Sequence, residues 1–340
     1  MRIEEANPSV AKARQLLKSA VVWDNVWPVD LPGNESIGNT WDKLQRFSQA
    51  GVSAIGLTLA GDNHNSAEAL RLVGWARNEI RTRSSLLTLI GSVDEIVTAK
   101  RDGKLGVVMQ FEGTRCFERD LNLIEAFYAL GVRQTLLAFN SANCAGAGCA
   151  EPVDGGLTAY GKRFIQEAER VGMLIDLSHV GRKTSLDALE VATQPMVFSH
   201  SNAIAVHPSF RNIDDEQARA CARTGGLVGI SAASDYLGDV HCRSEALFRH
   251  LDHYVQLVGA EHVGIGFDVV FDPEPMSRWA RNRPDEWPMV KDPAWPGFRY
   301  AMPEQLVELA SLMVSHGYSD ADVKGILGHN YLRICARVWK

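Results

Sequence analysis

The chain contains 340 residues, of which 46% are hydrophobic and 22% charged, with 35 Lys and Arg against 41 Asp and Glu and a formal net charge of −6. This acidic balance, without a long block of like charges, excludes a basic nucleic-acid-binding surface, and the composition excludes a disordered or fibrous chain. The longest apolar stretches, at 51–61 and 225–233, run for about ten residues, whereas a membrane-spanning helix needs roughly 20.

The N-terminal sequence MRIEEANPSVAKARQLLKSA places charges between its apolar residues, so no secretory signal is visible. The six cysteines show neither Cys-x-x-Cys spacing nor the density of a disulfide scaffold. We therefore expect reduced thiols, a cytoplasmic location, and no membrane or nucleic-acid partner.

Short apolar runs rich in β-branched residues recur along the chain, separated by stretches whose apolar positions repeat every three or four residues. The predicted strands are 20–25, 52–59, 105–112, 134–140, 173–179, 195–200, 227–232 and 262–268. Amphipathic helices are expected at 121–131, 159–172, 182–193, 214–226 and 244–260.

Strands that alternate with helices in a chain of this length predict an α/β fold of the closed (β/α)8 TIM-barrel type. An open doubly wound sheet is the main alternative, but its usual Gly-x-Gly-x-x-Gly turn does not follow the first strand. We expect one barrel domain over 1–340. The Trp- and Pro-rich stretch at 271–302 is expected to be an irregular lid or the contact of a homodimer, followed by closing helices at 302–317 and 319–339.

Four predicted strands end in a titratable residue: Glu112, His179, His200 and Asp268. Such residues need a reason in parallel strands, which are buried on both faces, and in a barrel these ends converge on one mouth. Two imidazoles and a carboxylate are a ligand set for zinc, with a coordination position left for water. Asp268 then suits the general acid/base in amide hydrolysis, and Arg211, in the loop after His200, suits a substrate carboxylate.

Six motifs in a fixed order carry a resemblance: GGLTAYGKRFIQEAERVGMLIDLSHV, FSHSNA, RNIDDEQ, GGLVGIS, HVGIGFD and ILGHNYLRI. The series resembles the membrane (renal) dipeptidase family, peptidase family M19, among the amidohydrolase-type barrels. It implies that Glu112 is the glutamate that bridges two zinc ions in that family, and that His179 and His200 hold the second zinc. It also implies that Arg211 binds the dipeptide's free carboxylate and that Asp268 is the catalytic acid/base.

Two stretches depart from the family pattern. The first strand of the family ends in Asp-Gly-His-x-Asp-x-Pro, whose His and Asp hold the first zinc, but this chain places Val26 and Pro28 there, or Pro28 and Asp30 if two residues are inserted. A histidine on the fourth strand of the family, in His-Asn-x-x-Asn, corresponds to Phe139. We therefore expect one zinc ion at the retained site, with Asp30 or His64 as the groups that could rebuild a first site.

The leading hypothesis is a zinc hydrolase that cleaves a dipeptide or a similarly small amide with a free carboxylate. An alternative is a divergent barrel that acts on a non-peptide amide, a lactam or a small acid, in a pocket made more apolar by Trp23, Trp27 and Phe139. A third is a catalytically dead relative that keeps the barrel for assembly or binding.

Overall fold

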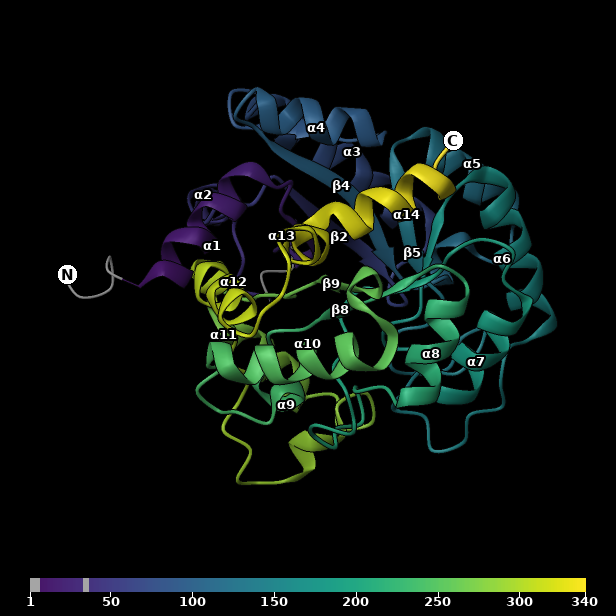
Figure 1. Cartoon of the computed structure of the whole chain (residues 1–340). Helices are drawn as coiled ribbons and strands as arrows, with labels where there is room; N and C mark the ends of the chain where they lie inside the picture. Colours follow the sequence, from purple (N-terminus) through teal and green to yellow (C-terminus); the bar gives the residue numbers. More distant parts are fainter. Residues whose placement is uncertain (1–6, 33–36) are drawn as a thin grey trace.

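The computed structural model describes residues 7–32 and 37–340 of the chain (Figure 1). Eight parallel strands form a nearly closed barrel in the order β1-β2-β4-β5-β6-β7-β8-β9, and the short strand β3 pairs with the start of β4. The strands are β1 Trp23–Pro28, β2 Ala54–Gly61, β3 Leu87–Leu89, β4 Leu105–Glu112, β5 Val132–Leu136, β6 Leu174–Asp176, β7 Val197–Phe198, β8 Leu227–Ile230 and β9 Val263–Ile265. Near the gap between β9 and β1, the Asp268 backbone N–H donates to the Val26 carbonyl at 3.2 Å. The predicted (β/α)8 fold is confirmed.

Helices surround the barrel and connect its parallel strands. They are α1 Pro8–Ser19, α2 Leu44–Gln49, α3 Ser66–Thr82, α4 Val93–Arg101, α5 Asn122–Ala129, α6 Ala159–Val171, α7 Arg182–Val191, α8 Asp215–Arg223, α9 Ser234–Leu237, α10 Ser244–Val258, α11 Pro273–Arg281, α12 Leu306–Ser315, α13 Asp320–Lys324 and α14 Asn330–Val338. Capping boxes begin α3, α4 and α8, where Asn65, Ser92 and Asp214 accept from the third residue of each helix. None of the described helices has the length and apolar character that a membrane crossing requires.

Several elements differ from the sequence-based predictions. The first strand lies three residues further along the chain than predicted, and neither β3 nor α1 was predicted. β3 has only three residues, too few for an apolar pattern to be read. The stretch at 271–302 was expected to be irregular, which is wrong in part, because α11 begins there with Pro273 at its first position, where a proline is tolerated.

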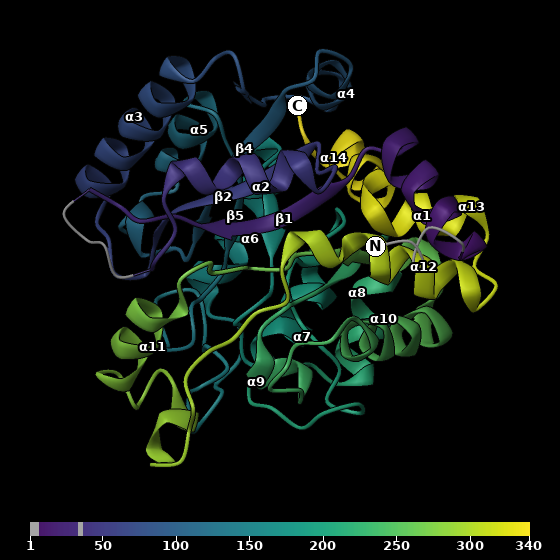
Figure 2. The same cartoon turned by 90° about the vertical axis from the view of Figure 1, so that its left-hand side faces the viewer.

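The two ends of the barrel are closed by different segments. Tyr331, Ile334 and Val338 of α14 pack against Trp23 and neighbouring apolar residues at the amino ends of the strands. Figure 2 shows α11 on the opposite side of the β1 and β2 ribbons from α14. The prediction that Trp23 and Trp27 line the pocket is wrong, because the ring of Trp27 packs edge-on against aromatic rings in the core and that of Trp23 packs at a tilt of 40° against Tyr331.

Asp24 is a buried carboxylate in β1. One of its oxygens accepts the Phe267 backbone N–H at 2.7 Å, the other has no hydrogen-bond partner among the described residues, and burial raises its pKa from 3.8 to about 7. The unfolded chain releases the Asp24 proton near pH 3.8, whereas the folded protein keeps it up to about pH 7. The free energy of unfolding therefore falls as the pH rises between these two values, because only the unfolded chain loses the proton in this range.

The variant Asp24→Asn is expected to be more stable than the wild type above about pH 7, by on the order of 4 kcal/mol at most, and to lose this advantage near about pH 4. Thermal unfolding of both proteins in chelator, across that range, measures the difference. An advantage that does not change with pH would show that Asp24 does not titrate in this window.

Candidate active site

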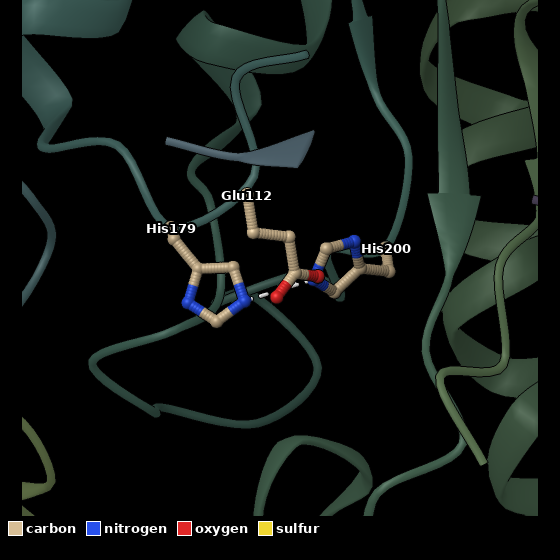
Figure 3. A group of neighbouring side chains, drawn as sticks. All are labelled: Glu112, His179 and His200. Atoms are coloured by element: carbon tan, nitrogen blue, oxygen red, sulfur yellow. Dashed lines mark hydrogen bonds between the residues drawn. The ribbon is translucent and has the colours of Figure 1, made fainter. Parts of the chain in front are cut away.

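The four titratable residues predicted at strand ends meet at the carboxyl end of the barrel. Glu112 is the last residue of β4, while His179, His200 and Asp268 follow β6, β7 and β9 by two or three residues. One potential ligand atom from each of Glu112, His179 and His200 lies within 4.8 Å of the other two. Figure 3 shows the Glu112 carboxylate directed toward both imidazole rings. The barrel thus brings together Glu112 and His179, which are 67 residues apart in the sequence (179 − 112).

The hydrogen bonds of His179 leave one of its ring nitrogens free to bind a ligand. Its Nδ1 lies 2.7 Å from the Asn140 side-chain oxygen, and the amide nitrogen of Asn140 donates to the Glu286 carbonyl at 3.0 Å, which fixes the orientation of that amide. Since the amide oxygen only accepts, Nδ1 of His179 carries the proton and Nε2 carries the lone pair. This Nε2 lies 2.9 Å from Nε2 of His200.

Buried polar groups form hydrogen bonds with the ring and the backbone of His200. The hydroxyl of Ser199 lies 2.6 Å from its Nδ1, and its backbone N–H donates to the hydroxyl of Ser178 at 3.0 Å. Asp176, at the end of β6, accepts the backbone N–H groups of Ser178 and Ser199 at 2.9 and 3.0 Å. A single buried carboxylate therefore ties together the two loops that carry the histidines, as supporting groups around metal ligands commonly do.

Burial shifts the pKa values of the titratable groups at this site toward their neutral forms. Burial and the nearby charge of Asp176 raise the pKa of Glu112 to about 7, and burial together with Glu112 raises the pKa of Asp268 well above its usual value. Burial and the charge of Arg211 lower the pKa values of His179 and His200 well below 6.5, so both rings are neutral. Neutral imidazoles beside two carboxyl groups are the ionic forms that bind a metal cation.

Arg211 lies beside the metal-ligand candidates but deeper than expected. Its side chain is 2% exposed, it donates to the His200 carbonyl at 3.2 Å, and it does not line the cavity described below. Among the described residues, its Nε has no hydrogen-bond partner and no carboxylate lies within 4.0 Å of the guanidinium. A buried cation without a counter-ion is costly, and a bound anion would lower that cost.

A cavity of about 720 Å³ opens above Glu112, His179 and Asp268. One wall is aromatic: Phe139 stacks on His179 with ring centroids 4.1 Å apart, and Trp287 packs edge-on against Phe139 at 5.9 Å. Trp279, on α11, continues this wall and contacts Trp287 at 5.8 Å. Phe139 therefore lines the pocket as predicted, and the segment that contains α11 covers the mouth of the barrel.

Strained backbone is concentrated around this cavity. Six described non-glycine residues have positive φ, and five of them line the cavity or bond to His179: Glu118, Arg119, Asn140, His179 and Asp268. Each such residue costs on the order of 1–3 kcal/mol, and such strain tends to gather at functional sites. This strain lowers the stability of the folded protein, and the left-handed backbone sets the direction of these side chains.

The groups that could rebuild a first metal site have other roles. Asp30 accepts the backbone N–H groups of Ile37 and Gly38 at 2.9 Å, and His64 accepts the Gly61 N–H at 3.2 Å. His64 lines the cavity, but among the described residues only Glu112, His179 and His200 form a potential metal-binding group.

Comparisons with known proteins show the family to which the chain belongs. A profile described as membrane dipeptidase, peptidase family M19, matches residues 66–277, which is more than half of the chain. The chain belongs to peptidase family M19. An uncharacterized protein from the pqqA 5′ region of Klebsiella pneumoniae is 31% identical over 265 residues, which cover 75% of this chain and 90% of that protein. An uncharacterized dipeptidase of Schizosaccharomyces pombe is 28% identical over 281 residues, covering 80% of this chain but only 62% of the yeast protein.

The fold agrees with this assignment. The crystal structure of an amidohydrolase from Pseudomonas aeruginosa has a TM-score of 0.85 and 23% identity, and the match covers 96% of this chain and 99% of that one. M19 proteins are metal-dependent hydrolases, and Glu112, His179 and His200 form the candidate metal site of this member.

Some residues of the site were not predicted from sequence. Asn140 and Ser199 each neighbour a predicted residue, but their bonds to His179 and His200 depend on how loops from different strands meet. Asp62 joins three loops by accepting the Phe139 and Arg115 backbone N–H groups and the Asn143 amide. A polar residue directly after an apolar run was the only available signal for Asp62.

Proposed function

We propose that this M19 member is a zinc-dependent dipeptidase with one metal ion, which cleaves a dipeptide or similar small amide with a free carboxylate. The observation that carries the proposal is the convergence of Glu112, His179 and His200 within 4.8 Å, next to Asp268. One ion is proposed because Val26 and Pro28 offer no side-chain donor where the family pattern has its first-site ligands. The family description and the name of the yeast relative support dipeptides as substrates.

The residues present fit a divalent ion. The lone pair on His179 Nε2 faces His200 Nε2 and the Glu112 carboxylate, and burial together with neighbouring carboxyl groups raises the pKa values of Glu112 and Asp268. When bound, such an ion polarises a carbonyl and lowers the pKa of water toward about 7.

Asp268 and Arg211 supply the remaining functions in this proposal. Asp268 takes a proton from the attacking water and delivers it to the leaving amine, a role that suits a half-buried carboxyl with a raised pKa. Arg211 binds the substrate carboxylate, which becomes its missing counter-ion. The aromatic wall of Phe139, Trp279 and Trp287 excludes water from the reacting atoms.

The variant Asn140→Gly is expected to weaken metal affinity by about tenfold or more, because His179 loses the acceptor that orients its ring. Glycine is chosen because position 140 has a φ of 51°, which glycine adopts without strain. Competition with a chromophoric chelator measures the affinity. Unchanged affinity, with unfolding of the metal-free protein also unchanged, would show that Asn140 does not support the site.

The direct test of function is a panel of dipeptides assayed after chelation and after stepwise addition of zinc. The proposal predicts no turnover in chelator and full activity at one zinc per chain. Activity that persists in chelator, or metal-loaded protein that cleaves no dipeptide, would contradict it.

The aromatic wall favours a second candidate, an amide with an apolar acyl group and no free amine, such as an N-acyl amino acid. Phe139, Trp279 and Trp287 offer an apolar surface beside His179 on which an apolar acyl group can pack. Faster cleavage of N-acyl amino acids than of the matching dipeptides would favour this candidate.

We also propose that the protein is cytoplasmic and forms a homodimer through the stretch at 271–302. Measurement of the molecular mass in solution tests the homodimer.

A further inference from the structure

We propose that Arg115 and Arg119 bind a second carboxylate on the substrate, so that this enzyme prefers dipeptides with an Asp or Glu side chain. The inference rests on the proposed dipeptidase function, since it concerns the same cavity. It extends that function from a substrate with one free carboxylate to one with two.

Both arginines belong to the loop that leaves the metal-ligand candidate Glu112. Arg115 and Arg119 follow Glu112 by three and seven residues, and both line the cavity that Glu112, His179 and Asp268 also line. Both side chains are exposed, whereas Arg211 is buried beside His200. Arg115 and Arg119 are thus accessible in the cavity lining, whereas Arg211 is not part of that lining.

The charges around these two arginines leave them without a counter-ion. No described carboxylate oxygen lies within 4.0 Å of either guanidinium. Glu118, between them in sequence, accepts both the backbone N–H and the hydroxyl of Ser66 at 2.8 Å. The Asp62 carboxylate accepts three donors from the loops, one of them the Arg115 backbone N–H, and the Arg115 guanidinium donates only to the Asp62 backbone carbonyl, at 3.4 Å.

The third arginine that lines the cavity belongs to a charge pair. Arg283 lies 4.0 Å from Glu286 and stacks over the ring of Trp279 at 4.2 Å. Both members of this pair line the cavity, so their charges offset each other. Of the described arginines that line the cavity, Arg115 and Arg119 are therefore the two without an ion-pair partner.

The backbone at Arg119 is held in an unfavourable conformation. Glu118 and Arg119 are consecutive non-glycine residues with φ of 48° and 65°. The bonds from Ser66, at the start of α3, hold Glu118 in place. Arg119 thus belongs to the same group of strained residues as His179 and Asp268, and strain that is maintained around a site points to a constraint on where these side chains lie.

The chemistry of two guanidinium groups selects an anion that offers several oxygen acceptors. In the proposed function, Arg211 binds the free terminal carboxylate of the substrate. Arg115 and Arg119 would therefore bind a different anionic group of the same substrate. Within a dipeptide, the side-chain carboxylate of Asp or Glu is such a group.

The test compares dipeptides that differ only by Glu or Gln, at each of the two positions in turn. For one position, the ratio of kcat/KM for the Glu and Gln substrates is expected to be about tenfold in the wild type and to fall below about twofold in R115Q/R119Q. The matched control is R163Q, which removes an exposed arginine of α6 that does not line the cavity, and it should keep the wild-type ratio. A wild-type ratio near one at both positions, or a ratio that survives in R115Q/R119Q, would overturn the inference.

A binding measurement separates this inference from the dipeptidase proposal. Glutarate carries two carboxylates and butyrate one, and Trp279 and Trp287 report their binding by fluorescence because both line the cavity. Glutarate is expected to bind about tenfold tighter than butyrate to wild-type protein but not to R115Q/R119Q, and this advantage should shrink as salt rises. Equal binding of the two acids would overturn the inference even if dipeptides are cleaved. Failure to cleave any dipeptide, with the glutarate preference intact, would instead overturn the dipeptidase proposal.

Discussion

Replacing Asp268 with asparagine is expected to lower kcat by about 10³-fold while leaving metal content unchanged. Asparagine keeps the size of the side chain but cannot take up and release a proton. Its backbone also tolerates the left-handed conformation that Asp268 adopts, with a φ of 55°. Steady-state kinetics on the best dipeptide, together with elemental analysis of the same preparation, measure both quantities.

The control is Asp94→Asn, which changes an exposed carboxylate of α4 that does not line the cavity. It should leave both kcat and metal content at the wild-type level. If Asp268→Asn retained most of the activity, the proton would be moved by another group. If it lost the metal as well, Asp268 would be part of the metal site rather than the acid/base.

Replacing Arg211 with methionine is expected to lower kcat/KM for dipeptides by about 100-fold, mainly through KM. Methionine fills most of the buried volume but removes the cation that the substrate carboxylate would pair with. The same variant should cleave the C-terminal amide of that dipeptide about as well as the wild type does, because this substrate has no carboxylate.

Because Arg211 contacts His200, its replacement could also change the metal site. The guanidinium donates to the His200 carbonyl and lowers the pKa values of both histidines, so loss of the charge could act on the metal site instead. An equal loss of activity on the dipeptide and its amide, with altered zinc affinity, would show that Arg211 supports His200 and does not bind the carboxylate.

The barrel could be predicted because its strands are buried on both faces. Runs such as 105–112 are almost wholly apolar, so a titratable residue at their end stands out, and the geometry of parallel strands places such ends together. Glu112, His179, His200 and Asp268 were predicted on this basis, and the structure brings them together. Their roles stay proposals.

Other features of the site could not be predicted from the sequence, because they depend on contacts between loops. The depth of Arg211 is set by packing around Tyr236 and His200, and the orientation of His179 by an amide whose own orientation depends on Glu286 in another loop. The left-handed backbone at Arg119 has no signal in residue type, because it occurs at a non-glycine position. These features carry much of the proposed specificity.

Zinc stoichiometry tests the central claim most directly, and elemental analysis of protein purified without chelator measures it for the wild type and for His179→Ala. We predict one zinc per chain in the wild type and none in the variant, because His179, His200 and Glu112 provide the only potential metal-binding group among the described residues. Two zinc ions per chain would contradict the single-ion account and would mean that groups such as Asp30 or His64 rebuild a first site. A wild-type protein without metal, or a variant that keeps its zinc, would contradict the assignment of these ligands.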